Sequence, residues 1–260
     1  MSVLAPPRGH QRIYRVNPVA KIAALLPLSV CVLLTLDWLS ASVALAGELL
    51  LFAVAGLRGR ALWLRTLPVW VAAPLAGLSM TLYGQASGAT YLQLGFVHVT
   101  EGSVAIGLAT VARVLAVALP AVVLLATIDP TDLADGLAQV VRLPSRFVLG
   151  ALAGLRLVGL FVQDWRSLEL ARRARGVADT GRLRRLLNQA LALLVLAIRR
   201  GGKLATAMEA RGFDGPTRRT WARPSPFGAP EAVTIACGVA LAAVSVWAAV
   251  ALGTWNFILG

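Results

Sequence analysis

Residues 103–126 read SVAIGLATVARVLAVALPAVVLLA, a run of twenty-four residues with a single charged side chain, Arg113. A helix needs roughly twenty consecutive, mostly apolar residues to cross the hydrocarbon core of a bilayer. The stretch therefore predicts a membrane-spanning helix. The composition of the chain agrees, because 58% of its residues are hydrophobic and only 14% are charged. We expect an all-α integral membrane protein.

Four further segments are long and apolar enough to span a bilayer, which makes about five transmembrane helices in all. They cover approximately residues 20–38, 41–57, 66–83 and 231–252. The first of them follows a basic leader that lacks a convincing small-residue cleavage site. We therefore expect it to be a retained helix and not a cleaved signal peptide.

The basic residues predict the orientation of these spans. With the N-terminus in the cytosol, 24 of the 25 Lys and Arg residues fall on the cytosolic side, and Arg113, inside the fourth span, is the exception. Loops rich in Lys and Arg stay cytosolic. We therefore expect a multi-pass protein of the cell membrane. This topology explains the formal charge of +13 without a nucleic-acid partner.

The basic residues also divide the chain into three parts. These are a leader with four membrane helices (1–128), a cytosolic region (129–230) and a final span with the C-terminus (231–260). The middle part is rich in Leu and Ala, and it predicts two long amphipathic helices, about 145–175 and 182–211, which pack along the cytosolic membrane face or cross one another there. The alternative is a membrane hairpin, which would place the seven arginines of 164–185 outside the cell, against the positive-inside rule.

Both long helices are predicted to end in the same residues. Ala171-Arg172-Arg173-Ala174-Arg175-Gly176 is echoed thirty-six residues later by Ala207-Met208-Glu209-Ala210-Arg211-Gly212. An arginine suits the negative end of a helix dipole, and the glycine after it suits a left-handed C-terminal cap. Taken singly, each arginine could simply cap its helix and touch lipid phosphates. The repetition favours two matching contacts with a partner.

These features together resemble the transmembrane T component of energy-coupling factor transporters, the vitamin and metal importers of prokaryotes. The resemblance covers nearly the whole chain. Besides the two repeats, its carriers are Arg15-Val16-Asn17-Pro18-Val19-Ala20-Lys21 before the first span and Ala126-Thr127-Ile128-Asp129-Pro130-Thr131-Asp132-Leu133 after the fourth. Phe213, directly after the second repeat, extends its likeness to the family signature.

The resemblance implies a scaffold that transmits the work of two ATP-hydrolysing subunits to a separate substrate-binding membrane protein, the S component. In the family, the Ala-Arg-Gly ends of two coupling helices dock in grooves of the two ATPases. Carried over by motif, Ala174, Arg175 and Gly176 would serve one ATPase, and Ala210, Arg211 and Gly212 the other. The chain has no Gly-x-x-x-x-Gly-Lys-Ser/Thr loop, so ATP and Mg²⁺ would be bound by the partners.

The apolar faces of 147–163 and 186–198 are candidates for the S-component surface, with burial inside this subunit as the alternative. Within the membrane, Arg113 and Glu48 in the second span lie at similar predicted depths, so an ion pair between them is possible. We interpret such a pair as holding the bundle together and not as a transport pathway.

Two other function classes are open to sequence alone. A stand-alone secondary transporter would need broken helices or polar residues at the midplane, for which only Arg113 and Glu48 qualify. A membrane enzyme would need a catalytic cluster, and the acidic residues at 129–135 are better explained as a helix start. The two histidines and two cysteines lack ligand spacing, so we expect no catalytic residues, bound cofactor or metal in this chain.

Overall fold

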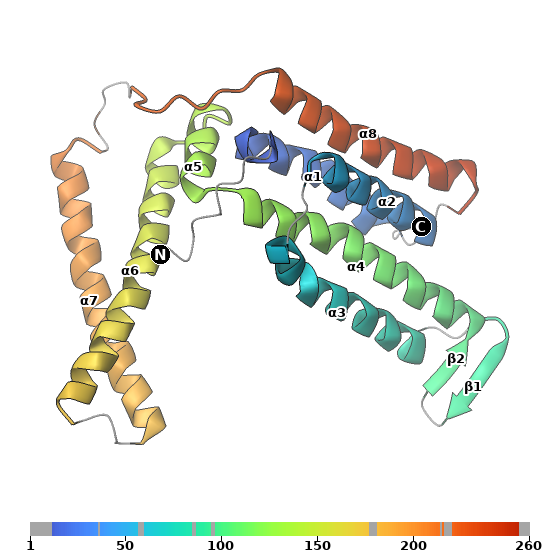
Figure 1. Ribbon diagram of the computed structural model, residues 1–260, viewed down its shortest axis with the longest axis horizontal. Coiled ribbons are helices and arrows are strands. Elements are labelled where there is room, and N and C mark those ends of the chain that lie inside the picture. The colour runs from blue at the N-terminus through green and yellow to red at the C-terminus, as the bar shows by residue number, and fades with distance from the viewer. Residues whose placement is uncertain are drawn as a thin grey trace. The chain divides into compact units, whose positions relative to one another are not determined.

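The computed structural model describes residues 12–35, 37–56, 60–84, 87–94, 97–176, 181–213, 215 and 220–254. The chain divides into two compact units. Pro6–Asp129 and Pro226–Gly260 form one unit, which we call the bundle, and Pro130–Ser225 lie in the other, which we call the α5–α7 unit. The bundle contains α1 (Pro18–Leu34), α2 (Trp38–Val54), α3 (Arg60–Tyr83), α4 (Glu101–Thr127) and α8 (Ala229–Ala251). The elements are labelled in Figure 1.

Helices dominate the described residues, and several of them are long and apolar enough to cross a membrane. Four meet the criterion of length and composition, namely α3 from Trp63 onward, α4, α6 and α8. Helices α1 and α2 are also apolar, but each has 17 residues and reaches about 26 Å, at the lower end of what a span requires. The expectation of an all-α, multi-pass membrane protein is confirmed.

The turn between α1 and α2 lies a few residues earlier than predicted. Helix α2 begins at Trp38 because the carboxylate of Asp37 caps it, accepting a hydrogen bond of 2.8 Å from the Ser40 backbone N–H. Helix α1 ends at Leu34 because Thr35 is extended, and its hydroxyl contacts the hydroxyl of Ser40 at 3.0 Å. The predicted bounds of 20–38 and 41–57 are corrected accordingly.

A short hairpin occupies part of the connection between α3 and α4, for which no strand was predicted. Strands β1 (Thr90–Leu94) and β2 (Val97–Thr100) pair antiparallel, and Thr100 then caps α4 through a reciprocal capping box with Ser103. Apolar and polar residues alternate in both strands, as in Val97-His98-Val99-Thr100, so the pattern was present in the sequence although no strand was predicted from it.

Helix α4 is the central helix of the bundle. It packs against α1, α2 and α3, while α8 packs against α1 and α2. One apolar cluster joins α1, α2, α4 and α8 around Leu28, Ala44, Ala116 and Ala242, and a second joins α3 and α4 around Ala73 and Leu119. Without a strong hydrophobic force between helices in lipid, such packing depends on close van der Waals fit.

A polar junction fastens three helix ends of the bundle to one another. The buried Lys21 ammonium at the start of α1 donates to the Thr127 carbonyl, at the end of α4, over 3.3 Å. Glu231, at the start of α8, accepts from the Asn17 backbone N–H at 3.3 Å, and the Asn17 amide donates to the Pro226 carbonyl at 3.1 Å. The two segments that resemble the T-component family before the first span and after the fourth therefore meet in space.

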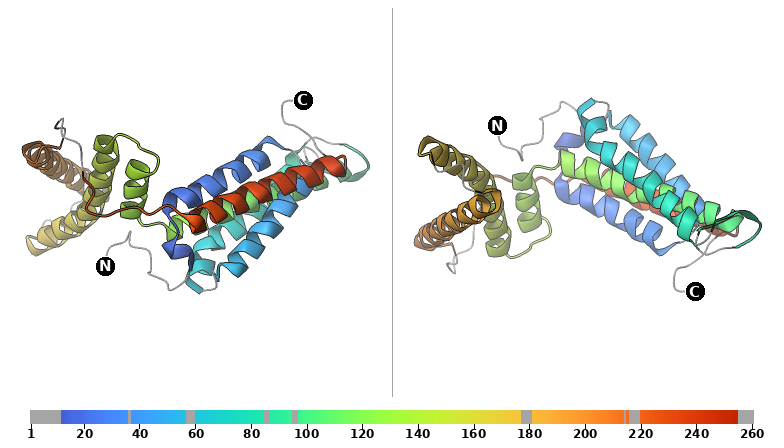
Figure 2. Two further views of the ribbon diagram at one scale, coloured as in Figure 1. Left: turned by 90° about the horizontal axis from the view of Figure 1, so that it is seen from above. Right: turned by 90° about the horizontal axis from the view of Figure 1, so that it is seen from below.

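The α5–α7 unit contains α5 (Pro130–Gln139), α6 (Ser145–Ala174) and α7 (Arg182–Ala210). Helices α5 and α6 share a small core of Ala134, Ala138 and Val148. Helices α6 and α7, predicted at 145–175 and 182–211, are confirmed as long helices. Figures 1 and 2 show that they cross each other, which is one of the two predicted arrangements. Helix α7 is amphipathic along its length, whereas most apolar residues of α6 precede Gln163 and five of its seven charged residues follow it.

The close approach of α8 to α1 generates a stability prediction. A Cβ added at Gly238 would lie 2.8 Å from the Ala24 carbonyl carbon, so Gly238→Ala must push two helix backbones apart. We expect it to destabilise the bundle by about 1–3 kcal/mol, seen as a lower midpoint of thermal unfolding in detergent. Gly47→Ala is the matched control, because its added methyl group meets only the flexible side chain of Leu241. Equal midpoints for the two variants would contradict this packing account.

Candidate functional site

The two Ala-Arg-Gly helix ends have the same backbone geometry. Arg175 follows α6 with φ −91° and ψ 4°, and Arg211 follows α7 with φ −90° and ψ 10°. The glycines after them are left-handed, with φ of 67° at Gly176 and 72° at Gly212. The predicted glycine caps are therefore confirmed, and the repeat in sequence is a repeat in structure.

Backbone hydrogen bonds explain why glycine stands at these positions. The N–H of Gly212 donates to the Glu209 carbonyl at 2.9 Å, and the N–H of Phe213 donates to the Met208 carbonyl at 3.0 Å. This pair of bonds is the Schellman motif, which requires a left-handed residue at the position of Gly212. The first of the two bonds recurs at α6, where Gly176 donates to Arg173 at 3.1 Å. Residues 177–180 lie outside the described residues.

Both helix ends are open to contact. All three residues of each end are exposed: Ala174, Arg175 and Gly176, and Ala210, Arg211 and Gly212. Within the described part of the chain, neither guanidinium has a hydrogen-bond or ion-pair partner. A cation with five unused donors on a slim helix end can bind acceptors in a groove of another molecule.

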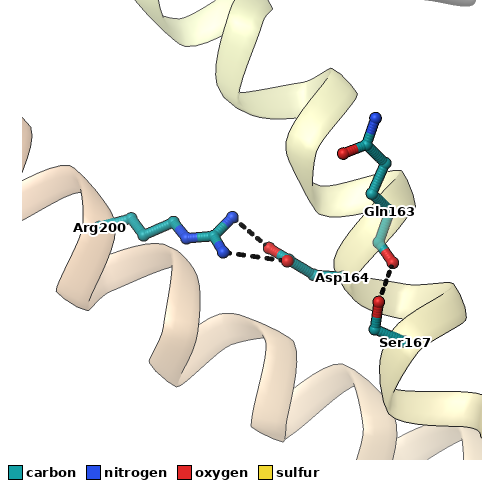
Figure 3. A network of polar contacts seen from close by, with 4 residues as sticks. All are labelled: Gln163, Asp164, Ser167 and Arg200. Atoms are coloured by element: carbon teal, nitrogen blue, oxygen red, sulfur yellow. Dashed lines mark hydrogen bonds and ion pairs between the residues drawn. The ribbon is translucent and has the colours of Figure 1, made fainter. Parts of the chain in front are cut away.

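An ion pair joins α6 and α7 where they cross. Arg200 of α7 binds both carboxylate oxygens of Asp164 of α6, with 3.0 Å between Nη2 and Oδ1, and Figure 3 shows the guanidinium and carboxylate facing each other. The nearby Ser167 hydroxyl donates instead to the Gln163 carbonyl of its own helix, at 3.0 Å. The sequence reasoning did not predict this pair.

The acidic residues at 129–135 stabilise the α5–α7 unit locally. Asp132 forms an ion pair of 3.0 Å with Arg223, and the Gln139 side chain binds the Arg223 carbonyl and the Ser225 N–H, each at 2.9 Å. Burial raises the pKa of Asp135, and the nearby Asp132 raises it further, while Arg223 and Arg156 lower it. The contacts of Asp132 and Gln139 hold the segment after α7 against α5.

The possible ion pair between Arg113 and Glu48 is corrected by the structure. Arg113 donates to the Thr35 carbonyl at the end of α1, and Asp37, not Glu48, acts on it electrostatically. Both carboxyl oxygens of the buried Glu48 lack a hydrogen-bond partner. Because α2 begins at Trp38, Glu48 lies about 15 Å along the helix from the end that Asp37 caps. Arg113 instead satisfies a carbonyl left open where α1 ends.

Apolar side chains cover much of the exposed surface of α6 and α7. The most apolar part of α6 contains no buried residue. On the predicted faces of 147–163 and 186–198, exposed large side chains include Phe147, Leu155, Val158, Leu160, Val162, Leu186, Leu187, Leu191, Leu194, Val195 and Ile198. In an aqueous environment such a surface requires cover by lipid or by another protein.

Fold and helix ends define a multi-pass, all-α membrane protein that presents two equivalent basic helix ends. Comparison with known sequences identifies the family. The profile of the family described as "Cobalt transport protein" (CbiQ) matches residues 9–221. The chain therefore belongs to this family, the EcfT/CbiQ-like transmembrane T components of energy-coupling factor transporters.

Three curated relatives carry the description "Energy-coupling factor transporter transmembrane protein". The protein of Bacillus selenitireducens is 26% identical over 90% of this chain and 92% of its own length. The protein of Listeria innocua is 26% identical over 82% of this chain and 84% of its own length. The protein of Limosilactobacillus fermentum is 29% identical over 58% of this chain, and the match spans 61% of that relative.

The left-handed cap of α7 can be tested directly. A Cβ at Gly212 would meet nothing within 4 Å, so the cost of Gly212→Ala is backbone strain alone, about 1–2 kcal/mol. We expect the amides of residues 212 and 213 to exchange hydrogen roughly 5- to 30-fold faster in this variant. Gly212→Asn is the control, because asparagine tolerates the left-handed region. Unchanged exchange in the alanine variant would show that the cap does not hold the helix end.

Proposed function

We propose that this chain is the coupling subunit of an ATP-driven importer of the energy-coupling factor type. It links two ATP-hydrolysing subunits to a separate S component that binds the vitamin or metal. The observation that carries the proposal is the pair of exposed helix ends with one backbone geometry, Ala174-Arg175-Gly176 and Ala210-Arg211-Gly212. Two related ATPases offer two equivalent grooves, and two equivalent helix ends match them.

The proposed topology places the N-terminus, the α5–α7 unit and both helix ends in the cytosol, where ATP is found. Helix α6 is apolar and long enough to span. If α6 and α7 crossed as a hairpin, however, the arginines of 164–185 would lie outside, against the positive-inside rule. A cytosolic location for both helices also keeps Arg175 and Arg211 on the same side of the membrane.

In this proposal the exposed apolar faces of α6 and α7 hold the S component. Leucine and valine side chains allow van der Waals contacts that are made and released as the ATPases close and open. The chain itself carries out no catalysis, and ATP and Mg²⁺ are bound by the ATPases. Substrate specificity then lies in the S component.

Affinity purification from the native membrane tests the proposal as a whole. We expect the tagged chain to recover two ATPases and one small hydrophobic membrane protein. Uptake by reconstituted vesicles should require ATP. A solitary chain that transports substrate without ATP would overturn the proposal and favour a secondary transporter.

Loss of the two arginines tests the coupling motifs. We expect the double variant Arg175→Ala/Arg211→Ala to insert normally and to lose both ATPases, since each arginine in a desolvated interface contributes about 2 kcal/mol or more, or roughly 30-fold in affinity. The control is Arg184→Ala/Arg199→Ala, which removes the same charge from exposed positions of α7. Wild-type retention of ATPases by the first variant would rule out the docking role.

A further inference from the structure

Asp164 and Arg200 hold equivalent places in the repeat. Each lies eleven residues before the arginine of its own helix end, so the thirty-six-residue spacing that relates Arg175 to Arg211 also relates Asp164 to Arg200. The structure brings these two equivalent residues into contact. The two helices therefore meet at equivalent positions of the repeat.

The ion pair consequently lies at the same distance along each helix from its Ala-Arg-Gly end. Eleven residues of helix correspond to about 16 Å on each side. From the crossing, the C-terminal parts of α6 and α7 lead away in opposite directions, which can be followed in Figure 1. Any slip or rotation at the crossing therefore changes the separation of the two ends.

The geometry of this ion pair is suited to fixing the angle at which α6 and α7 cross. The planar guanidinium of Arg200 engages both oxygens of Asp164, and two parallel hydrogen bonds restrict rotation more than a single bond would. The Asp164 side chain is 17% exposed and that of Arg200 is 36% exposed, so water screens the pair only in part. A lysine would keep the charge but not the fork.

We propose that Asp164 and Arg200 are positioning residues, which fix the crossing of α6 and α7 and thereby set the separation of the two Ala-Arg-Gly ends. The identity of what docks at those ends rests on the proposed function. The fixed crossing itself is a property of this chain and can be measured without any partner.

Distances between spin labels test the crossing in the purified full chain. Ala171 and Ala207 are equivalent, exposed positions one turn before the two ends, and each is replaced by cysteine after Cys31 and Cys237 are changed to alanine. We expect one narrow distance distribution in the parent. Asp164→Asn should broaden it, Arg200→Lys should broaden it less, and the exchange Asp164→Arg/Arg200→Asp should narrow it again.

The control and the outcomes separate positioning from folding. Glu169→Gln removes the exposed ion pair of 2.6 Å between Glu169 and Arg173 within α6, and the distribution should stay narrow. A narrow distribution in Asp164→Asn would overturn the proposal, as would broadening that the exchanged pair does not reverse. ATPase recovery should fall and return with the same variants. If the distances behave as expected but the parent retains no ATPase, the proposed function fails and the positioning role stands.

A second observation concerns the part of each helix between the Asp164–Arg200 pair and its Ala-Arg-Gly end, which we call the arm of that helix. Directly after Arg200, α7 contains Gly201 and Gly202, and the Thr206 hydroxyl donates back to the Gly202 carbonyl at 3.0 Å. Adjacent glycines and such back-bonding both promote helix bending. The equivalent positions of α6 are Trp165 and Arg166. We infer that the arm ending in Arg211 bends at Gly201–Gly202 more readily than the arm ending in Arg175, which has a similar back-bond from Ser167 to Gln163 but lacks the glycine pair.

Alanine at the two glycines tests the bend without a steric clash, because an added Cβ meets nothing within 4 Å at either position. We expect Gly201→Ala/Gly202→Ala to slow hydrogen exchange over residues 203–210 by up to roughly 30-fold, from the higher helix propensity of alanine. ATP-coupled uptake should fall at the same time. Ser167→Ala, in the part of α6 that leads to Arg175 and outside the apolar face of 147–163, is the control, where uptake should not change. Unaltered exchange, or slowed exchange with full uptake, would overturn the inference.

Discussion

The polar junction of Asn17, Lys21, Thr127 and Glu231 is the constraint on which the arrangement of the bundle depends. Apolar packing between helices in lipid is not directional, so it does not by itself fix the position of one helix along the axis of its neighbour. Lys21 fixes the start of α1 to the end of α4, and Glu231 fixes the start of α8 to the start of α1. Both covalent connections to the α5–α7 unit, at 129–130 and 225–226, begin beside these residues. The bundle is therefore fastened by polar contacts at the end where the chain leaves it for the α5–α7 unit.

Away from the junction, the bundle is held by close contact between small residues. Cβ atoms at Gly77 and Gly107 would lie 2.7 and 2.8 Å from the carbonyl oxygen of the opposite glycine, so α3 and α4 touch backbone to backbone. The glycines of α6 differ, because Gly150, Gly154 and Gly159 face open space. The glycines at this helix contact in the bundle are thus covered by the neighbouring helix, whereas the glycines of α6 are left uncovered.

Local features were predictable from sequence, and contacts between distant residues were not. The spans and the glycine caps follow from runs of apolar residues and from the αL preference of glycine, both of which act within a few residues. The partner of Arg113 depended on where α2 begins, which Asp37 decides by capping at Ser40. Asp164 and Arg200 are separated by the same thirty-six residues as the two copies of the repeat. This spacing indicates a contact between them only once the crossing of α6 and α7 is known.

Helices α6 and α7 share some features of the repeat and differ in others. Their lengths and helix ends match. Their faces do not, because α7 is amphipathic and α6 is apolar over its first half and charged over its second. At the crossing itself, equal residues would place two like charges together and force the helices apart. Aspartate on one helix and arginine on the other make that position an attraction, so the two helices have equivalent ends but differ where they meet.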